Sequence, residues 1–277
     1  MKIARIIDTQ GNTRLGIPQD NGQNNDTVQI LQGNLLSGLE PTDEIAEVRH
    51  RLSPVEPADI YCIGLNYKGH AAEIDMKEPE YPVVFMKPST ALQHPGMPVY
   101  NPAACEYGPE LDYEGELAVI IGRTCRNVPV DEALDYVLGY TCGNDISARK
   151  WQMHAGGGQW VRGKSFDTFC PLGPVLVTPE DLPDPQNLRI RTRVNGETLQ
   201  DGHTGDMIFS VAEIIRFLSR DTSLRPGTAI LTGTPAGVGF TRNPPVWLED
   251  GDKIEVEIEG IGTLRNPVEK LAADERR

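Results

Sequence analysis

The sequence predicts an α+β fold in which strands dominate and helices are few. Of 277 residues, 28 are glycine and 22 are proline, together about 18% of the chain against a usual ~12%. These residues separate short apolar runs and follow no period, which is typical of many turns between short strands. Only residues 208–218 show a clear helical repeat of apolar side chains.

The first 54 residues are expected to form a small N-terminal domain, followed by a larger domain over residues 55–277. Residues 3–7 and 28–31 read as short strands on either side of a polar, turn-rich stretch at 20–26. Ser53-Pro54-Val55-Glu56-Pro57 is a linker candidate, because proline interrupts helices. This unit contains no pattern that indicates chemistry, so it is expected only to pack or dimerise.

The larger part is predicted to be β-rich, without the alternation of strand and helix that builds parallel sheets. Asn195-Gly196 after an alternating segment predicts a hairpin turn. The predicted strands are 60–65, 83–86, 114–121, 188–194, 229–231 and 254–258, and the predicted helical segments are 68–76, 130–138, 148–152 and 208–218.

Charge and hydropathy exclude several classes of protein. Lys and Arg number 26 and Asp and Glu 40, giving a net charge of −14, which repels nucleic-acid phosphates. The longest aliphatic run, 117–121, is far shorter than the ~20 residues of a membrane span. The N-terminus becomes polar at Asp8, too soon for a signal peptide. A cytoplasmic protein with reduced cysteines is expected, acting without nucleic acid or membrane.

Three acidic residues form the first candidate site. Glu114 and Glu116 lie two apart in a predicted strand, so their side chains share one face. Neighbouring carboxylates resist joint ionisation unless a cation lies between them, and the flanking residues are apolar. Asp145 offers a third carboxylate, and such a set suits Mg²⁺ or Mn²⁺. The ordinary alternative is an acidic surface strand.

His70 and Glu73 form the second candidate site. They lie three apart in a predicted helix, where Glu73 can orient His70 and raise its basicity. Such a pair suits a general base. The alternative is a chance pair on a surface helix.

Arg149, Gln152 and Lys164 form a third candidate set. Arg149 and Gln152 share a face of a short helix and suit a substrate carboxylate or keto oxygen. Lys164 suits an electrostatic anchor or a Schiff-base nucleophile. Taken singly, each is equally explained as a solvated polar side chain. Residues 158–165 match the spacing of a phosphate-binding P-loop, but neither the preceding strand nor the following helix is predicted, so no nucleotide site is expected.

In order along residues 57–270, the motifs together resemble the fumarylacetoacetate hydrolase superfamily, in its branch of acylpyruvate hydrolases and 2-hydroxyhepta-2,4-diene-1,7-dioate isomerases. The motifs that carry the resemblance are Gly64-Leu65-Asn66-Tyr67, His70-Ala71-Ala72-Glu73, Phe85-Met86-Lys87-Pro88, Asp112-Tyr113-Glu114-Gly115-Glu116-Leu117, Asn144-Asp145-Ile146-Ser147-Ala148-Arg149, Lys164-Ser165-Phe166-Asp167, Asn195-Gly196-Glu197, Thr232-Gly233-Thr234-Pro235 and Gly251-Asp252.

The resemblance implies a mixed β-roll or barrel-like sandwich with a small N-terminal domain, assembled as a homodimer. It also implies a Mg²⁺ or Mn²⁺ cofactor and a mobile lid helix that carries a His–Glu dyad. The positions that it assigns are Glu114, Glu116 and Asp145 for the metal, His70, Glu73 and Lys164 for catalysis, and Arg149, Gln152 and Thr234 for substrate binding. The segment 103–110 looks longer than usual, which affects the expected shape of the pocket.

The expected function is metal-dependent hydrolysis of a C–C bond in an acylpyruvate, a 2,4-dioxo acid, through a metal-stabilised enolate. An oxaloacetate-type decarboxylase and an isomerase, hydratase or dehydratase of 2-oxo acids stay open on the same site. A Lys164 Schiff-base aldolase is a rival mechanism. A non-enzymatic metal- or carboxylate-binding protein is a rival class.

Overall fold

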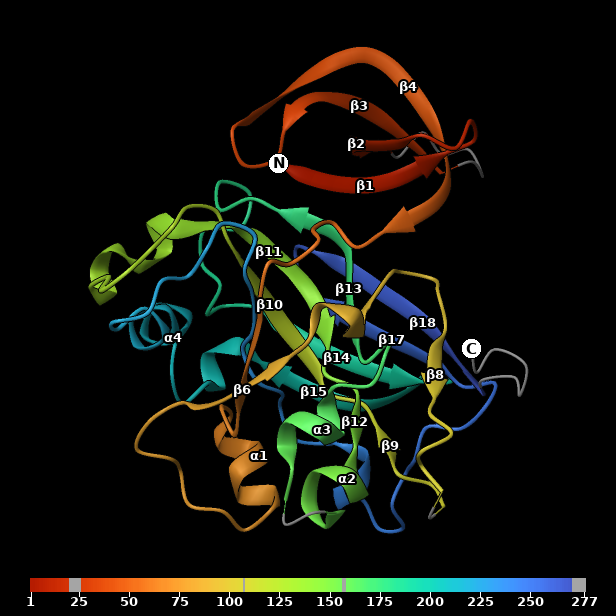
Figure 1. Ribbon diagram of the computed structural model, residues 1–277, viewed down its shortest axis with the longest axis vertical. Coiled ribbons are helices and arrows are strands. Elements are labelled where there is room, and N and C mark those ends of the chain that lie inside the picture. The colour runs from red at the N-terminus through yellow and green to blue at the C-terminus, as the bar shows by residue number, and fades with distance from the viewer. Residues whose placement is uncertain (20–25, 107, 156–157, 271–277) are drawn as a thin grey trace.

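Strands are the main regular elements of the computed structural model, which describes residues 1–19, 26–106, 108–155 and 158–270 (Figure 1). The strands are β1 Lys2–Asp8, β2 Thr13–Gln19, β3 Thr27–Asn34, β4 Gly38–Leu52, β5 Ile60–Gly64, β6 Val83–Lys87, β7 Leu92–Gln93, β8 Val99–Asn101, β9 Leu111–Asp112, β10 Gly115–Ile121, β11 Val137–Asn144, β12 Ser147–Ala148, β13 Cys170–Val177, β14 Arg189–Val194, β15 Glu197–His203, β16 Ala229–Leu231, β17 Lys253–Ile258 and β18 Gly262–Lys270. The α-helices are α1 Lys68–Glu73, α2 Arg149–Met153, α3 Trp160–Lys164 and α4 Val211–Leu218.

The first four strands form a curled layer at one end of the molecule (Figure 1). β1 pairs with both β2 and β4, and β3 pairs with β2 and β4, so the pairings close a ring. Ile3 of β1 also pairs with Leu176 of β13, which joins this layer to the main sheet. β2 and β4 have no predicted counterpart, because most β4 side chains are exposed or half-buried and give no apolar alternation. Except for Asp26, the expected turn at 20–26 lies outside the described residues.

The large sheet runs in the order β2-β3-β4-β1-β13-β11-β10-β16-β5-β6, and a five-stranded sheet, β15-β14-β17-β18-β8, packs against it. β10 lies inside this sandwich, and all seven of its residues are buried. Leu117 and Val119 of β10 share one core with Ile190 and Val256 of the facing sheet. The β-rich α+β fold predicted from the sequence is therefore confirmed.

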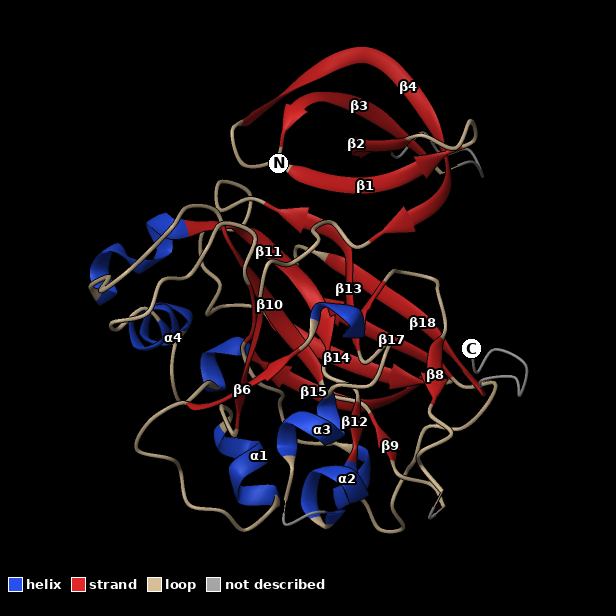
Figure 2. Ribbon diagram, in the orientation of Figure 1, coloured by secondary structure: helices blue, strands red, loops and turns tan. Residues whose placement is uncertain are grey.

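The short helices α1, α2 and α3 gather at the end of the sandwich farthest from β1–β4 (Figure 2). α1 is shorter than the predicted helix over 68–76, because Asp75 takes a positive φ of 53° just after the helix ends. α4 begins later than predicted, because Ser210 and Glu213 form a capping box at its start. None of the helices in the described ranges is long and apolar enough to cross a membrane.

The helix predicted over residues 130–138 is wrong. Residues Val130–Tyr136 form a 3-10 helix, and Val137 begins β11, where it pairs with Ile121. Only Ala133 of this 3-10 helix is buried. Sheet pairing therefore prevails over a weak amphipathic pattern. All five cysteines are free thiols, and four of them are buried. A single chain is described, so the expected homodimer stays a prediction.

Candidate metal centre and active site

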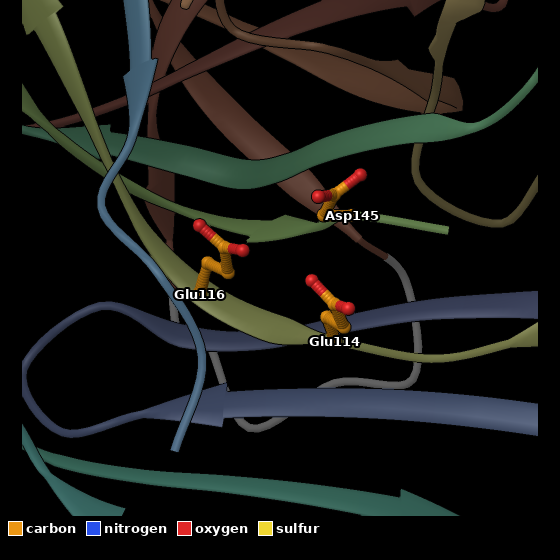
Figure 3. Close-up of side chains that lie close together, drawn as sticks. All are labelled: Glu114, Glu116 and Asp145. Carbon is orange, nitrogen blue, oxygen red and sulfur yellow. The ribbon is translucent and has the colours of Figure 1, made fainter. Parts of the chain in front are cut away.

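The antiparallel pairing of β10 and β11 brings the three acidic residues together. Glu116 pairs with Gly143, so the start of β10 lies beside the end of β11. The N–H of Asp145 donates to the carbonyl oxygen of Glu114 at 2.9 Å, which fixes the two residues side by side. One carboxylate oxygen from each of Glu114, Glu116 and Asp145 lies within 4.8 Å of the others, and all three residues are buried (Figure 3).

Buried cations surround two of these carboxylates. Lys164 Nζ lies 2.9 Å from Glu114 Oε2 and 2.7 Å from Asp145 Oδ2. Lys87 Nζ lies 2.6 Å from Asp145 Oδ1, and Arg149 Nη1 lies 2.7 Å from Glu114 Oε1. Each attraction is far stronger here than at a wet surface, because the local dielectric constant is low.

Glu116 differs from the other two carboxylates. In the part of the chain that the structure describes, it has no ion pair within 4.0 Å. Its Oε2 accepts a hydrogen bond of 2.6 Å from the N–H of Gly233. Burial, followed by the charges of Asp145 and Glu114, raises the pKa of Glu116 well above its usual range. A further positive charge at this position would stabilise the ionised form of Glu116 and lower its pKa.

Burial would also raise the pKa of Glu114, but Lys164 and Arg149 outweigh it and hold that pKa well below its usual range. Glu114 is therefore a carboxylate even without a metal. Asp145 Oδ1 is buried and accepts no hydrogen bond, although Lys87 lies nearby. Three converging carboxylates, of which Glu116 has no ion pair within the described residues, fit a divalent cation that prefers oxygen ligands.

Arg149 opens α2 and is held on several sides. Its Nε donates to Asp112 Oδ2 at 2.8 Å, and its Nη1 donates to Gln152 Oε1 at 2.9 Å. The guanidinium lies 4.4 Å from the ring centre of Phe240, a cation–π contact. Because Asp112 also accepts a 2.7 Å hydrogen bond from the N–H of Gly239, the whole group is fixed before any ligand binds.

The segment 103–110 supports α2. The carbonyl oxygen of Glu110 accepts from the N–H of Arg149 at 3.0 Å, and its Oε2 accepts from the N–H of Lys150 at 3.0 Å. Trp151 Nε1 donates to the carbonyl oxygen of Ala104 at 3.2 Å. These contacts link Ala104 and Glu110 to the helix that presents Arg149, whereas the greater length expected for this segment stays a prediction.

His70 and Glu73 meet on α1 as their spacing predicts. His70 Nδ1 lies 3.2 Å from Glu73 Oε2. Glu73 Oε1 also accepts from the N–H of Gly237 at 3.0 Å and from Thr241 Oγ1 at 2.7 Å. Burial would raise the pKa of Glu73, but its hydrogen bonds with His70, Thr241 and Gly237 lower it overall. A charged Glu73 therefore ties α1 to the loop 237–241.

These groups border a partly open cavity of about 110 Å³. Its polar lining is His70, Glu114, Arg149, Gln152, Lys164 and Thr234, and its apolar lining is Ile63, Gly64, Leu65, Ile74, Met76, Phe85, Met153, Trp160 and Phe240. Glu73, Glu116 and Asp145 lie behind this lining. The structure thus brings the nine residues chosen from the sequence to one place, in contact with the cavity or one residue behind it.

Sequence reasoning missed several neighbours of the site. Trp160 has no role assigned from the sequence. Its ring lies edge-on to that of Phe85, with 5.8 Å between the ring centres, and it borders the cavity. Gly64 makes room for it, since a Cβ there would lie 2.7 Å from the indole ring. Asp112 and Lys87 were quoted within motifs without a role. For Lys87, the sequence offered one signal: a lysine at the end of an apolar strand, directly before a proline.

Comparison with known proteins agrees with this geometry. Residues 59–269 match the family model of the fumarylacetoacetate (FAA) hydrolase C-terminal domain, and residues 1–52 match an Rv2993c-like N-terminal domain. The mitochondrial oxaloacetate tautomerase fahd2 of Xenopus laevis is 45% identical over 218 residues, which cover 78% of this chain and 67% of that protein. Since that relative is mitochondrial, a cytoplasmic location stays a prediction here.

Two solved structures share the fold over nearly the whole chain. The 5-carboxymethyl-2-hydroxymuconate delta-isomerase of Mycobacterium smegmatis has a TM-score of 0.82 at 36% identity, covering 98% of this chain and 100% of that one. The fumarylacetoacetate hydrolase of Exiguobacterium antarcticum has a TM-score of 0.81 at 35% identity, with the same coverage. The chain belongs to the fumarylacetoacetate hydrolase family, a family of enzymes.

The substitution Glu116→Gln tests the metal centre. It removes one negative charge and one oxygen ligand while keeping the side-chain shape. The affinity for Mn²⁺, measured by titration calorimetry, should fall by more than the ~10–100-fold that follows loss of a residue that merely orients a ligand. Glu44→Gln, on exposed β4, is the matched control. Unchanged Mn²⁺ affinity in Glu116→Gln would remove Glu116 from the metal site.

The raised pKa of Glu116 predicts a pH dependence of metal binding. A proton on this carboxylate must leave before a cation binds. Protons therefore compete with the metal ion even at a pH where an ordinary carboxylate is already ionised. The Mn²⁺ affinity should fall as pH is lowered from about 8 to about 5, approaching about tenfold per pH unit below the pKa of Glu116. A constant affinity over this range would mean that Glu116 is already ionised in the metal-free protein.

Proposed function

We propose that this member of the fumarylacetoacetate hydrolase family is a divalent-metal-dependent enzyme that interconverts the keto and enol forms of a short 2-oxo acid of the oxaloacetate type. The observation that carries the proposal is the lining of the small cavity, where a single imidazole, His70, lies together with Lys164 and Glu114. Tautomerisation needs one group that moves a proton beside a stabilised negative charge, and it needs no second substrate.

Glu114, Glu116 and Asp145 would hold Mg²⁺ or Mn²⁺, because both ions prefer carboxylate oxygens. When bound, the ion supplies Lewis-acid polarisation of the acid's oxo and carboxylate oxygens. Arg149 and Gln152, already hydrogen-bonded to each other, bind the substrate's carboxylate and oxo group.

Thr234 also lines the cavity on the polar side. Its Oγ1 donates to the carbonyl oxygen of Gly115 at 3.0 Å and accepts from Gln200 Nε2 at 2.7 Å. This hydroxyl therefore fixes the loop after β16 against the start of β10 and shapes the wall that the substrate meets.

His70 moves the proton. When its Nδ1–H donates to Glu73, its Nε2 is the free acceptor. In the keto-to-enol direction, Nε2 would take a proton from the carbon beside the oxo group and deliver the same proton to the enolate oxygen, which leaves His70 neutral again. The reverse direction returns the proton to carbon, so the two forms balance without a co-reactant.

Lys164 supplies a fixed positive charge for the oxygen on which negative charge develops. Burial would lower the pKa of Lys164, but Asp145 and Glu114 raise it above its usual value. A Schiff base requires a neutral amine. The charged Lys164 therefore favours electrostatic catalysis over the aldolase mechanism that the sequence left open.

The size of the cavity favours an isomerisation over a hydrolysis. A volume of about 110 Å³ is well below the ~300 Å³ of ordinary ligand pockets, and each water takes ~30 Å³. A short acid leaves little space for an attacking water. The similarity to an oxaloacetate tautomerase supports the same choice.

A second candidate is the acylpyruvate hydrolase expected from the sequence. The apolar wall formed by Ile74, Met76 and Trp160 favours it, because an acyl tail would bury against these side chains. In that reaction, His70 would take the proton of a water that attacks the distal carbonyl. The two candidates share the metal site and differ in whether a water molecule enters.

The experiment follows the enol absorbance of oxaloacetate and, separately, pyruvate release from acetylpyruvate, each with Mg²⁺ and with EDTA. Metal-dependent acceleration of the first reaction alone is the expected result. Pyruvate release from acetylpyruvate alone would replace the tautomerase with the hydrolase. Pyruvate release from oxaloacetate, above the background with Mg²⁺ alone, would indicate a decarboxylase.

His70→Asn tests the role of the imidazole in the same assay. The amide keeps a similar shape but is no base, so kcat should fall about 100- to 10,000-fold. The Mn²⁺ affinity should be retained, because His70 is not one of the three carboxylates. A variant with full tautomerase activity would exclude His70 as the proton carrier.

A further inference from the structure

Lys87, the last residue of β6, is a buried cation that the proposed reaction does not use. Its side chain is 0% exposed, and it is absent from the lining of the cavity. Its Nζ lies 2.5 Å from the carbonyl oxygen of Lys164, 2.8 Å from that of Phe169 and 3.1 Å from that of Ile146. An ammonium has three N–H donors, and these three carbonyls use all of them.

The three carbonyls belong to the segments that carry the site. Ile146 directly follows Asp145, Lys164 ends α3, and Phe169 immediately precedes β13. Three buried carbonyl dipoles that converge on one point are costly without a donor, because each would lose its hydrogen bond. One ammonium on β6 therefore holds together three points of the chain that lie 59, 77 and 82 residues further along the sequence.

A lysine ammonium lies beside each of the two carboxylate oxygens of Asp145. Lys87 Nζ lies 2.6 Å from Oδ1 without donating a hydrogen bond to it, while Lys164 Nζ donates to Oδ2 at 2.7 Å. The same Lys87 also fixes the backbone of Lys164. Lys87 therefore contacts Asp145 directly and Lys164 through its main chain.

We infer that Lys87 is a positioning residue that sets the orientation of Asp145 and Lys164 and thereby the affinity for the divalent cation. The inference rests on the proposed metal site. Lys87 does not reach the cavity, so its contribution passes through these two residues and not through contact with substrate.

Two other accounts of Lys87 predict different results when it is replaced by methionine, which has similar length but no charge. If its charge alone mattered, removing a positive charge 2.6 Å from a ligand oxygen would strengthen cation binding. If it only stabilised the fold, thermal stability would fall and cation affinity would not change. A positioning role predicts weaker cation binding even though a competing positive charge has gone.

The test measures Mn²⁺ affinity by titration calorimetry in the wild type, Lys87→Met and Lys87→Arg. The affinity of Lys87→Met should fall about 10- to 100-fold, the usual effect of losing a residue that orients a metal ligand. Lys87→Arg keeps the charge, but its planar fork cannot place three donors on carbonyls that converge at one atom. Lys87→Arg should therefore also weaken Mn²⁺ binding. If Lys87→Met does not fold, the Mn²⁺ affinity of Lys87→Arg alone tests the inference.

Ile214→Ala, in the buried face of α4, is the control for lost stability. It should lower the melting temperature without changing the Mn²⁺ affinity. Unchanged or tighter Mn²⁺ binding in both Lys87 variants would overturn the inference. A wild type that binds no Mn²⁺ would instead refute the proposed metal site, so the two failures are distinguishable.

Discussion

The constraint on which the structure depends is the burial of three carboxylates at the edge of an apolar sandwich. Each such charge costs several kcal/mol unless it is paired and hydrogen-bonded. Glu114, Glu116 and Asp145 are placed there by the pairing of β10 with β11. Lys87, Lys164 and Arg149 come from β6, α3 and α2 to meet them. Two of the short helices at this end of the molecule, α2 and α3, thus carry Arg149 and Lys164 to the carboxylates.

Charge balance also explains how the site selects its chemistry. The cations pair with Glu114 and Asp145, and Glu116 has no ion pair in the described part of the chain, so one more cation would balance its charge. The cavity beside it carries positive charge and an imidazole on one wall and apolar side chains on the other. Such a site favours a small anion that passes through an enolate. Under the proposed function, the entry of a water molecule is what distinguishes the hydrolase candidate from the tautomerase candidate.

Much of the candidate site could be proposed from the sequence, because several of its residues lie at short fixed spacings and its motifs resemble those of a known family. Glu114 with Glu116, His70 with Glu73 and Arg149 with Gln152 are local pairs that strand or helix geometry brings together. Lys87 could not be assigned a role, since its partners are main-chain carbonyls at positions 146, 164 and 169. The sequence did not predict β4, and it predicted a longer helix where the 3-10 helix precedes β11. In both places the conformation depends on pairing with strands that are distant in sequence.

The central claim is that the three carboxylates bind one divalent cation beside the cavity that holds a 2-oxo acid. A crystal structure with Mn²⁺ and oxalate, a mimic of the enolate, tests it most directly through the anomalous signal of manganese. We expect a single manganese peak. One oxygen atom from each of Glu114, Glu116 and Asp145 should lie about 2.0–2.3 Å from the manganese ion, and oxalate should bind the ion on the side that faces the cavity. A peak ligated by other residues, or oxalate bound in the cavity without manganese at the carboxylates, would contradict it.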